Sequence, residues 1–324
     1  MKVAIIFENK GPMAVTDAHV AQVRAALPDA EIRLAASGRA LIDEGFDADV
    51  LICWTTGGHF IAEEYCRYAG GLKWIHGLSS GVEGLLDSAA AGLPGVRVTS
   101  SKGIHGIPMS NHVMGFILSF LRRFPEFRRS QDQKAWNRLM PDEAAGKTLT
   151  IIGMGSIGRA VARAAKAFDM TVYGIKRRAQ PLEYVDAVYS EDELPGVLGR
   201  SDFVTMLLPA NEATRHFMNA ERFGQMKPGS YFINVGRGQT VDEQALIAAL
   251  QSGHLAGAAL DVADPEPIGA DSPLWAMDNV LITPHVAADT PRYMERAFGV
   301  FQKNAPLFLA GRPMASEIDL DAKY

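Results

Sequence analysis

Three side chains with complementary chemistry stand where three apolar runs of the sequence end. Arg237 lies in a Gly-Arg-Gly turn, Glu266 stands between two prolines, and His285 follows a threonine and a proline. Arginine can bind a carboxylate in a fork and polarise a carbonyl oxygen, and histidine can donate a proton. Glutamate can hold the imidazole and favour its cationic form. The set suits reduction of a 2-keto acid, with Arg237, Glu266 and His285 as catalytic residues.

Each of these residues also has an ordinary structural explanation. A Gly-Arg-Gly sequence is often only a turn, and a glutamate between prolines often marks a rigid exposed loop. A lone histidine after proline is more often structural than catalytic. Their order along the chain, after a nucleotide-binding pattern, favours the catalytic interpretation.

A glycine-rich turn predicts where a dinucleotide binds. Gly153, Gly155 and Gly158 form the pattern G-x-G-x-x-G between the apolar run 149–152 and an apolar series at helical spacing. In such a strand–turn–helix unit, the N–H groups at the start of the helix bind a pyrophosphate. The alternative is a structural glycine turn in another α/β domain. The predicted contacts are Gly153, Met154, Gly155, Ser156, Ile157 and Gly158.

The end of the next predicted strand indicates which nicotinamide cofactor binds. NAD sites usually carry Asp or Glu there, about 20 residues beyond the glycines. Here the run 171–175 leads into Lys176, Arg177 and Arg178. Three cations attract the 2′-phosphate of NADP, which a carboxylate would repel. We therefore expect NADP(H) to be preferred, with NAD(H) possible; the alternative is an exposed basic turn.

Alternating apolar runs and helical patterns must position these groups. Strands are expected over 3–7, 31–35, 50–54, 73–76 and 97–99, and then over 149–152, 171–175, 187–189, 203–208, 231–235, 256–262 and 280–283. This alternation predicts an α/β protein with two doubly wound parallel-sheet domains, the second of which binds the dinucleotide. A ligand cleft between the domains is the expected consequence.

Three further segments are expected between and after these strands. A helix over about 110–124 should be ended or kinked by Pro125. Residues 130–147 are polar and are expected to form a connecting arm, and a long helix is expected over about 291–309. In the first domain, the loops 55–58 and 78–84 consist largely of small residues, whose backbone N–H groups suit a carboxylate. Two solvent turns would fit that spacing equally well.

Composition and charge limit the possible partners. A chain of 324 residues with 48% apolar and 21% charged residues is typical of a soluble globular protein. The net charge of −5 argues against nucleic-acid binding, and the longest apolar run, 113–121, is too short to span a membrane. Cys53 and Cys66 form neither a disulfide framework nor a metal motif, so we expect a cytoplasmic protein without a metal site.

Taken together, the motifs resemble the D-2-hydroxyacid dehydrogenase family. The similarity is specific over 146–158, 207–209 with Thr214, 223–229, 233–238, 257–262 with 265–267, and 283–285, and looser over 72–75, 80–82 and the helix after Pro108. The resemblance implies a homodimer. It also implies a flavodoxin-like substrate domain over 1–101 and 290–324, and a Rossmann-type dinucleotide-binding domain over 102–289.

The resemblance also implies residue roles. It assigns catalysis to Arg237, Glu266 and His285. Backbone groups of Gly81 and Val82 would help to hold the substrate carboxylate, with Arg237, His285 and the pocket residue Thr55 also at the substrate. Further pocket residues would be Trp54, Ser79, Met109 and Trp275. Beyond the glycine turn and the basic run, cofactor contacts would come from Leu208, Pro209, Thr214, Val235, Gly236 and Asp261, the last at the nicotinamide amide.

The basic run 176–178 resembles the NADPH-using glyoxylate/hydroxypyruvate reductases of this family. NADPH-dependent reduction of these small 2-keto acids to 2-hydroxy acids is therefore expected. Two alternatives stay open: a dehydrogenase for bulkier keto acids such as phenylpyruvate, and a non-catalytic NAD(P)-sensing protein like the corepressors that resemble the family. One departure concerns Ser110, Asn111 and His112, which replace the Ala-Glu-His of many members.

Overall fold

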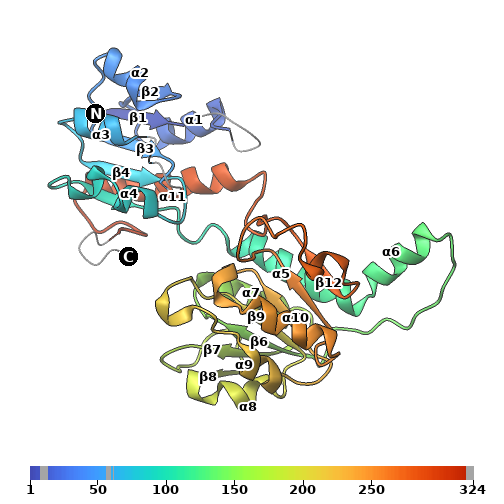
Figure 1. The fold of residues 1–324 in the computed structure, drawn as a ribbon. Helices are drawn as coiled ribbons and strands as arrows, with labels where there is room; N and C mark the ends of the chain where they lie inside the picture. Colours follow the sequence, from blue (N-terminus) through green and yellow to red (C-terminus); the bar gives the residue numbers. More distant parts are fainter. Residues whose placement is uncertain (8–13, 56–59, 61, 319–324) are drawn as a thin grey trace. The chain divides into compact units, whose positions relative to one another are not determined.

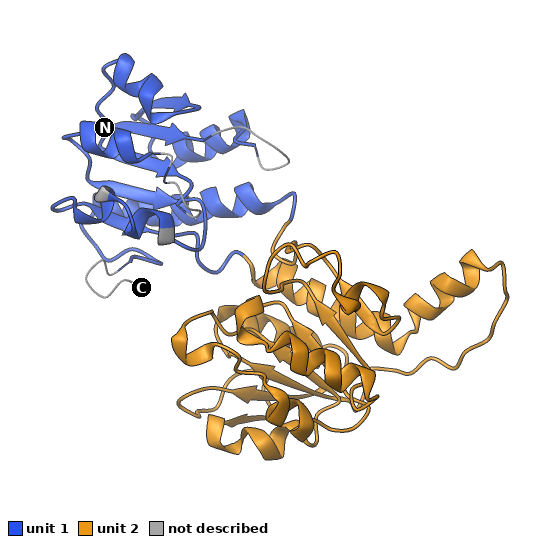
Figure 2. Ribbon diagram, viewed as in Figure 1, with its two compact units in different colours: residues 1–104, 290–324 blue, residues 105–289 orange. Residues whose placement is uncertain are grey.

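The computed structural model describes residues 1–7, 14–55, 60 and 62–318, and the chain divides into two compact units. Unit 1 comprises residues 1–104 and 290–324, and unit 2 comprises residues 105–289 (Figure 2). Each unit is built on one parallel sheet, which confirms the predicted two-sheet α/β fold. Unit 2 is inserted into the sequence of unit 1, so the last segment of the chain returns to complete unit 1.

Among the described residues, unit 1 contains a five-stranded parallel sheet in the order β2-β1-β3-β4-β5 (Figure 1). Its strands are β1 (Lys2–Ile6), β2 (Glu31–Ala35), β3 (Val50–Cys53), β4 (Trp74–Gly77) and β5 (Arg97–Thr99). Its helices are α1 (Asp17–Ala26), α2 (Gly38–Asp43), α3 (Glu63–Tyr68), α4 (Glu83–Leu86), the 3-10 turn η1 (Ala89–Gly92) and α11 (Tyr293–Leu309). Strands β3 and β4 are buried along their whole length, as expected for a sheet covered on both faces.

An aromatic stack and a buried histidine join α11 to this sheet. The ring of Trp74 stacks on Phe301 with their centroids 4.8 Å apart. His76 is fully buried, with Nδ1 2.8 Å from the hydroxyl of Thr99 and Nε2 3.3 Å from the carbonyl oxygen of Ala297. Burial disfavours the charged ring and lowers the pKa of His76 to about 4, although the bond to Ala297 acts in the opposite direction.

We expect unit 1 to lose stability as the pH falls from about 6.5 toward 4. In this window the unfolded chain protonates His76 while the folded chain does not, so protonation favours unfolding. The full shift corresponds to about 3 kcal/mol of unfolding free energy. Urea unfolding at about pH 7 and about pH 4.5 measures the loss. His76→Gln should show a smaller difference between the two pH values, and an equal difference in both proteins would contradict the assignment.

Among the described residues, unit 2 contains a seven-stranded parallel sheet in the order β12-β11-β10-β9-β6-β7-β8. Its strands are β6 (Thr148–Ile152), β7 (Thr171–Ile175), β8 (Ala187–Tyr189), β9 (Phe203–Met206), β10 (Tyr231–Asn234), β11 (Gly257–Leu260) and β12 (Val280–Ile282). Its helices are α5 (Gly106–Leu121), α6 (Phe124–Asp132), α7 (Ser156–Lys166), α8 (Leu194–Leu198), α9 (Ala220–Gln225) and α10 (Glu243–Gln251), with 3-10 turns η2 (Glu191–Glu193), η3 (Glu212–Thr214), η4 (Gly238–Thr240) and η5 (Pro273–Ala276). The strand order reverses between β6 and β9, and ligands of such sheets bind at the carboxyl ends of the strands beside that point.

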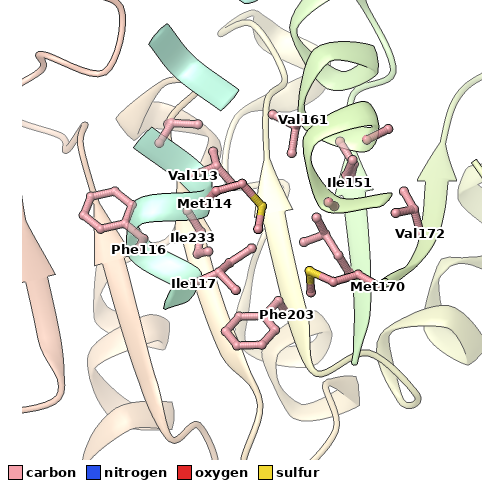
Figure 3. Packing of buried hydrophobic residues seen from close by; sticks show 14 of the residues in the cluster. Val113, Met114, Phe116, Ile117, Ile151, Val161, Met170, Val172, Phe203 and Ile233 are labelled. Carbon is pink, nitrogen blue, oxygen red and sulfur yellow. The ribbon is translucent and has the colours of Figure 1, made fainter. Parts of the chain in front are cut away.

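Helices α5 and α7 pack together on one face of this sheet. In Figure 3, Val113, Met114 and Ile117 of α5 lie in one apolar cluster with Phe203 and Ile233 of the strands. The apolar stripe that predicts a helix in the sequence is therefore the face that α5 buries. This packing fixes α5 against the strands whose carboxyl ends carry the predicted site.

The predicted helix over 110–124 differs from the structure at both ends. Helix α5 begins at Gly106 and ends at Leu121. Arg123 then adopts a left-handed conformation with φ of 58°, and Pro125 lies in the first turn of α6. Proline suits that position because the first N–H groups of a helix lack partners within the helix. Pro125 therefore starts a second helix, and the predicted connecting arm is irregular only over 133–147.

Both cysteines are buried in unit 1. Burial raises the pKa of the Cys66 thiol to about 12, and the thiol of Cys53 is raised well above its ordinary value by the same cause. Within the described ranges, no group of His, Cys, Asp and Glu side chains could hold a metal ion. No described helix is long and apolar enough to cross a membrane.

Candidate active site

The glycine turn between β6 and α7 has the backbone geometry that close approach of a phosphate requires. Gly153 has φ of 110°, and a Cβ there would lie 3.0 Å from the carbonyl carbon of Leu207. A Cβ on Gly158 would lie 2.4 Å from the carbonyl oxygen of Gly153, so both positions require glycine. Gly155 precedes the first residue of α7, and a Cβ there would meet open space. The turn therefore fits a pyrophosphate at the N-terminus of α7.

The other residues of the turn differ in how their side chains are placed. Ser156 is exposed and Ile157 is half-buried, whereas Met154 is buried. A Cβ on Gly174 would lie 2.7 Å from Cγ of Met154, so this side chain packs on β7. Only the backbone of Met154 is therefore placed to contact a cofactor.

The basic run begins where β7 ends, on the strand next to β6. The N–H of Lys176 donates to the carbonyl oxygen of Tyr189 at 3.0 Å, which fixes the start of the run at the sheet edge. Lys176 is half-buried, and Arg177 and Arg178 are exposed. Three cations thus follow β7, the strand next to β6, at the position predicted for the 2′-phosphate.

The remaining predicted cofactor residues lie in the loops after β9, β10 and β11, namely Leu208, Pro209, Thr214, Val235, Gly236 and Asp261. A Cβ on Gly236 would lie 3.0 Å from the carbonyl oxygen of Leu208, so the loops after β9 and β10 are in close contact. The hydroxyl of Thr214 donates to the carbonyl oxygen of Pro209 at 2.6 Å and closes that turn. These loops surround the carboxyl ends of the strands beside the glycine turn.

His285 and Glu266 form a hydrogen-bonded pair. Nδ1 of His285 lies 2.7 Å from Oε2 of Glu266, and Oε1 of the same carboxylate accepts the N–H of Ala263 at 3.1 Å. The side chains are 50% and 39% exposed, so solvent reaches both. With Nδ1–H donated to the carboxylate, Nε2 is the ring nitrogen that can carry a proton to a ligand. Two residues 19 positions apart in the sequence are thus brought together by the loops after β11 and β12.

The loop that carries His285 is held by the buried carboxylate of Asp261. Oδ1 accepts the hydroxyl of Thr283 at 2.6 Å and the N–H of Val286 at 2.9 Å, and Oδ2 accepts the N–H of Ala287 at 3.0 Å. The N–H of His285 also donates to the carbonyl oxygen of Asp261 at 2.8 Å. His285 has φ of 54°, which is unfavourable for a residue other than glycine and persists only where the surroundings enforce it. Asp261 supplies that constraint, while its contact with nicotinamide stays a prediction.

Arg237 is exposed in the loop after β10. The side-chain amide of Asn234 donates to the carbonyl oxygen of Arg237 at 3.1 Å and fixes the backbone there. A Cβ on Gly238 would lie 1.8 Å from the carbonyl oxygen of Ala263, so this loop packs directly on the loop that carries Glu266. The structure therefore brings the loops of the three predicted catalytic residues to one edge of the sheet of unit 2.

Two further histidines, which were not predicted as site residues, lie close to members of this set. The positive charge of Arg237 contributes, after burial, to lowering the pKa of His105, and Asp289 acts in the opposite direction. Nε2 of His112 lies 3.0 Å from the hydroxyl of Thr283. His112 and Thr283 are 171 positions apart, and only the family tripeptide drew attention to His112 in the sequence.

A cavity of about 540 Å³ opens beside the histidine–glutamate pair. Its walls are Leu260, Asp261, Val262, Ala263, Glu266, Pro267, Ile268, Trp275, Ile282, Thr283, Pro284 and His285. The indole N–H of Trp275 donates to the carbonyl oxygen of Gly269 at 2.9 Å, which holds the ring in the wall. The volume and the mostly apolar lining are typical of a small-molecule site.

The predicted substrate residues Thr55, Gly81 and Val82 belong to unit 1. Thr55 is fully buried, and its hydroxyl lies 2.7 Å from that of Ser79 and donates to the carbonyl oxygen of Gly81 at 2.9 Å. The side chain of Thr55 therefore supports the loop after β4, and its hydroxyl does not face solvent. Residues 56–58 of the predicted loop 55–58 lie outside the described residues. Val82 is also buried, so any ligand contact there falls to its backbone.

Known proteins resemble this chain over most of its length. The family described as D-isomer specific 2-hydroxyacid dehydrogenase, NAD binding domain, matches residues 114–287. A glyoxylate reductase of Thermofilum pendens is 35% identical over 273 residues, which cover 82% of this chain and 79% of that protein.

Solved structures extend the similarity to both units. An NADPH-dependent glyoxylate/hydroxypyruvate reductase of Sinorhizobium meliloti, in complex with NADP and sulfate, has a TM-score of 0.78 at 29% identity, with 100% of this chain and 99% of that chain covered. A D-isomer specific 2-hydroxyacid dehydrogenase of Xanthobacter autotrophicus, in complex with NADPH and MES, has a TM-score of 0.79 at 31% identity, with the same coverage. The predicted resemblance is confirmed: the chain belongs to the D-isomer specific 2-hydroxyacid dehydrogenase family and is an NAD(P)-dependent oxidoreductase.

Proposed function

We propose that the protein reduces small 2-keto acids, glyoxylate and hydroxypyruvate, to 2-hydroxy acids with NADPH. The observation that carries this proposal is the 2.7 Å pair between Nδ1 of His285 and Glu266 at the sheet edge that also carries Arg237. The reductase names of the relatives from Thermofilum pendens and Sinorhizobium meliloti support the substrate class.

The proposed mechanism divides the work among three side chains. Bound NADPH supplies the hydride that reduces the keto carbon. Arg237 binds the substrate carboxylate in a fork and polarises the keto oxygen. His285 donates a proton from Nε2 to that oxygen as it becomes a hydroxyl. Glu266 accepts Nδ1–H, which orients the ring for this transfer.

The cofactor contacts follow the loops at the carboxyl edge of unit 2. We assign the pyrophosphate to the turn 153–158 and the N-terminus of α7, and the 2′-phosphate to Lys176, Arg177 and Arg178. Leu208, Pro209, Thr214, Val235, Gly236 and Asp261 complete the set. The preference for NADPH over NADH is supported by these three cations and by the NADP-containing structures of the two similar proteins.

Replacing the basic run with an acid should shift the cofactor preference toward NADH. Lys176→Asp combined with Arg177→Ala removes two cations and adds a carboxylate that repels the 2′-phosphate. We expect kcat/KM for NADPH to fall by about 100-fold, while that for NADH changes by less than about tenfold. Arg128→Ala, which removes an exposed arginine from α6, serves as the control. Unchanged NADPH and NADH efficiencies would show that the run is only an exposed turn.

A panel of 2-keto acids tests the proposed activity. NADPH oxidation is measured with glyoxylate, hydroxypyruvate and phenylpyruvate at equal concentration. The proposal requires turnover of glyoxylate or hydroxypyruvate at higher kcat/KM than phenylpyruvate. The opposite order would support the second candidate, a dehydrogenase for bulkier keto acids, which the apolar walls of the 540 Å³ cavity favour. Turnover of none of the three acids would contradict the proposed substrate class.

We also propose a homodimer and a cytoplasmic location. The segment 133–147 carries Trp136 and Met140, which are 97% and 86% exposed and would be covered by a second copy. Helix α6, which leads into this segment, projects from the sheet of unit 2 (Figure 1). Light scattering should give twice the chain mass of 35.0 kDa.

The proposed cytoplasmic location rests on the cysteines. The buried thiols of Cys53 and Cys66 support a reducing compartment.

A further inference from the structure

A chain of hydrogen bonds connects helix α5 to the loop that carries His285. Nε2 of His112 lies 3.0 Å from the hydroxyl oxygen of Thr283, and this hydroxyl lies 2.6 Å from Oδ1 of Asp261. The carboxylate then accepts the N–H groups of Val286 and Ala287, which directly follow His285. The side chain of Asp261 is 2% exposed and that of His112 is 21% exposed, so the carboxylate at the centre of these contacts is buried.

The direction of each hydrogen bond follows from the carboxylate. An ionised Asp261 can only accept, so the Thr283 hydroxyl must give its single proton to Oδ1. The oxygen of Thr283 must then accept from His112, which requires a proton on Nε2 of the ring. Burial lowers the pKa of His112, and the charge of Asp261 acts in the opposite direction. The neutral Nε2–H tautomer satisfies every donor and acceptor in the chain.

The helix gives His112 a fixed position. The His112 ring meets the Phe116 ring edge-on, with centroids 4.6 Å apart and planes at 87°, and Phe116 is buried. Helix α5 itself is packed on α7 and the sheet. In contrast, the loop after β12 holds His285 at φ of 54°, a conformation that needs support from its surroundings.

We propose that His112 is a positioning residue that acts through Thr283 and Asp261 to hold His285 in the orientation needed for proton transfer. The expected effect on kcat rests on the proposed reductase function, whereas the hydrogen bonds that hold the His285 loop do not depend on it. His112 touches neither of the proposed catalytic partners Arg237 and Glu266 in this chain of contacts. His112 donates a hydrogen bond from Nε2–H to the oxygen of Thr283. This bond favours the orientation in which the Thr283 hydroxyl donates to Asp261.

Kinetics of matched variants test the positioning role. His112→Leu should lower kcat by about tenfold, the cost of one buried hydrogen bond, with KM for glyoxylate and NADPH within about twofold. His112→Gln retains an N–H at the end of the side chain and should recover most of the lost kcat. Thr283→Val should resemble His112→Leu, and the double variant should lose no more than either single variant, because both break the same chain. Equal losses in His112→Leu and His112→Gln, or additive losses in the double variant, would overturn the proposal.

A measurement without turnover separates this inference from the proposed activity. Nitrogen-15 NMR of the histidine rings in the full chain, with the His112 signals identified by their loss in His112→Gln, reports which ring nitrogen carries the proton. The proposal requires a protonated Nε2 at neutral pH, and Thr283→Val should shift that signal. A ring protonated only on Nδ1 would overturn it. If the wild type reduces no keto acid, the proposed function fails, while the NMR result still decides the hydrogen-bond chain.

Discussion

His285→Ala should lose most of the catalytic activity, with kcat for glyoxylate lower by about 10² to 10⁴-fold. The variant removes the ring that Glu266 holds and with it the proposed proton donor. Steady-state NADPH oxidation at saturating substrate measures kcat. The affinity for NADPH should stay close to that of the wild type, because the glycine turn and the basic run lie on other strands.

Two controls make this result specific to His285. His216→Ala removes another exposed histidine of unit 2 and should leave kcat unchanged. Glu266→Gln retains a hydrogen-bond acceptor for Nδ1 and leaves the ring of His285 in the protein, so its loss should be smaller than that of His285→Ala. NADPH affinity measured by fluorescence separates lost chemistry from lost binding. Turnover like that of the wild type in His285→Ala would refute the assignment of the proton donor.

Arg237→Ala should lower kcat/KM for glyoxylate by about 10² to 10³-fold, or about 3 to 4 kcal/mol of transition-state stabilisation. The fork of the guanidinium is expected to bind the carboxylate in the ground state and the developing oxyanion in the transition state. The loss should therefore be seen in both KM and kcat. The fixed backbone of the loop, held by Asn234, should keep the fold intact in the variant.

The matched variants for this position are Arg237→Lys and Arg128→Ala. Lysine keeps the charge without the planar fork, so Arg237→Lys should lie between the wild type and Arg237→Ala. Arg128 is an exposed arginine of α6 that pairs with Asp132, and its removal should change kcat/KM by less than about twofold. If Arg237→Ala has the kcat/KM of the wild type, Arg237 does not bind the substrate.

The strands were predictable because a sheet covered on both faces requires continuous apolar runs. Val50–Cys53 and Trp74–Gly77 are buried at every position, and their sequences show it directly. Strand ends were less predictable: the run expected over 203–208 ends at Met206, because Leu207 and Leu208 turn to contact Gly153 and Gly236. Such endings depend on contacts between loops that are distant in the sequence.

The helix break at Pro125 was ambiguous in the sequence for a physical reason. Proline ends a helix when it lies in the interior but suits the first turn of a new one. The choice is made by Arg123, whose left-handed conformation ends α5 before the proline is reached. An arginine in the sequence does not indicate that conformation, so α6 could not be predicted. The structure has this second helix where the expected arm begins.

The sequence predicted those site residues whose side-chain chemistry indicates a role, but not the residues that support them. The identities of Glu266 and His285 and their places after apolar runs indicated a pair, and the structure shows the bond between them. The support from His112 was not predictable, because its partner Thr283 lies 171 positions away and neither residue type implies the contact. At Thr55 the position at a strand end suggested a ligand contact; the structure shows its buried hydroxyl bonded to Gly81, and the substrate role stays a prediction.

The insertion of unit 2 into unit 1 determines the order in which the nascent chain can fold. The ribosome releases all of residues 105–289 before α11, so the unit with the glycine turn can fold while unit 1 is still incomplete. Until Phe301 emerges, Trp74 lacks the ring on which it stacks, and the apolar surface of unit 1 that α11 covers is open to chaperones and proteases. During synthesis, unit 2 can therefore complete its fold at a stage when the core of unit 1 still lacks α11.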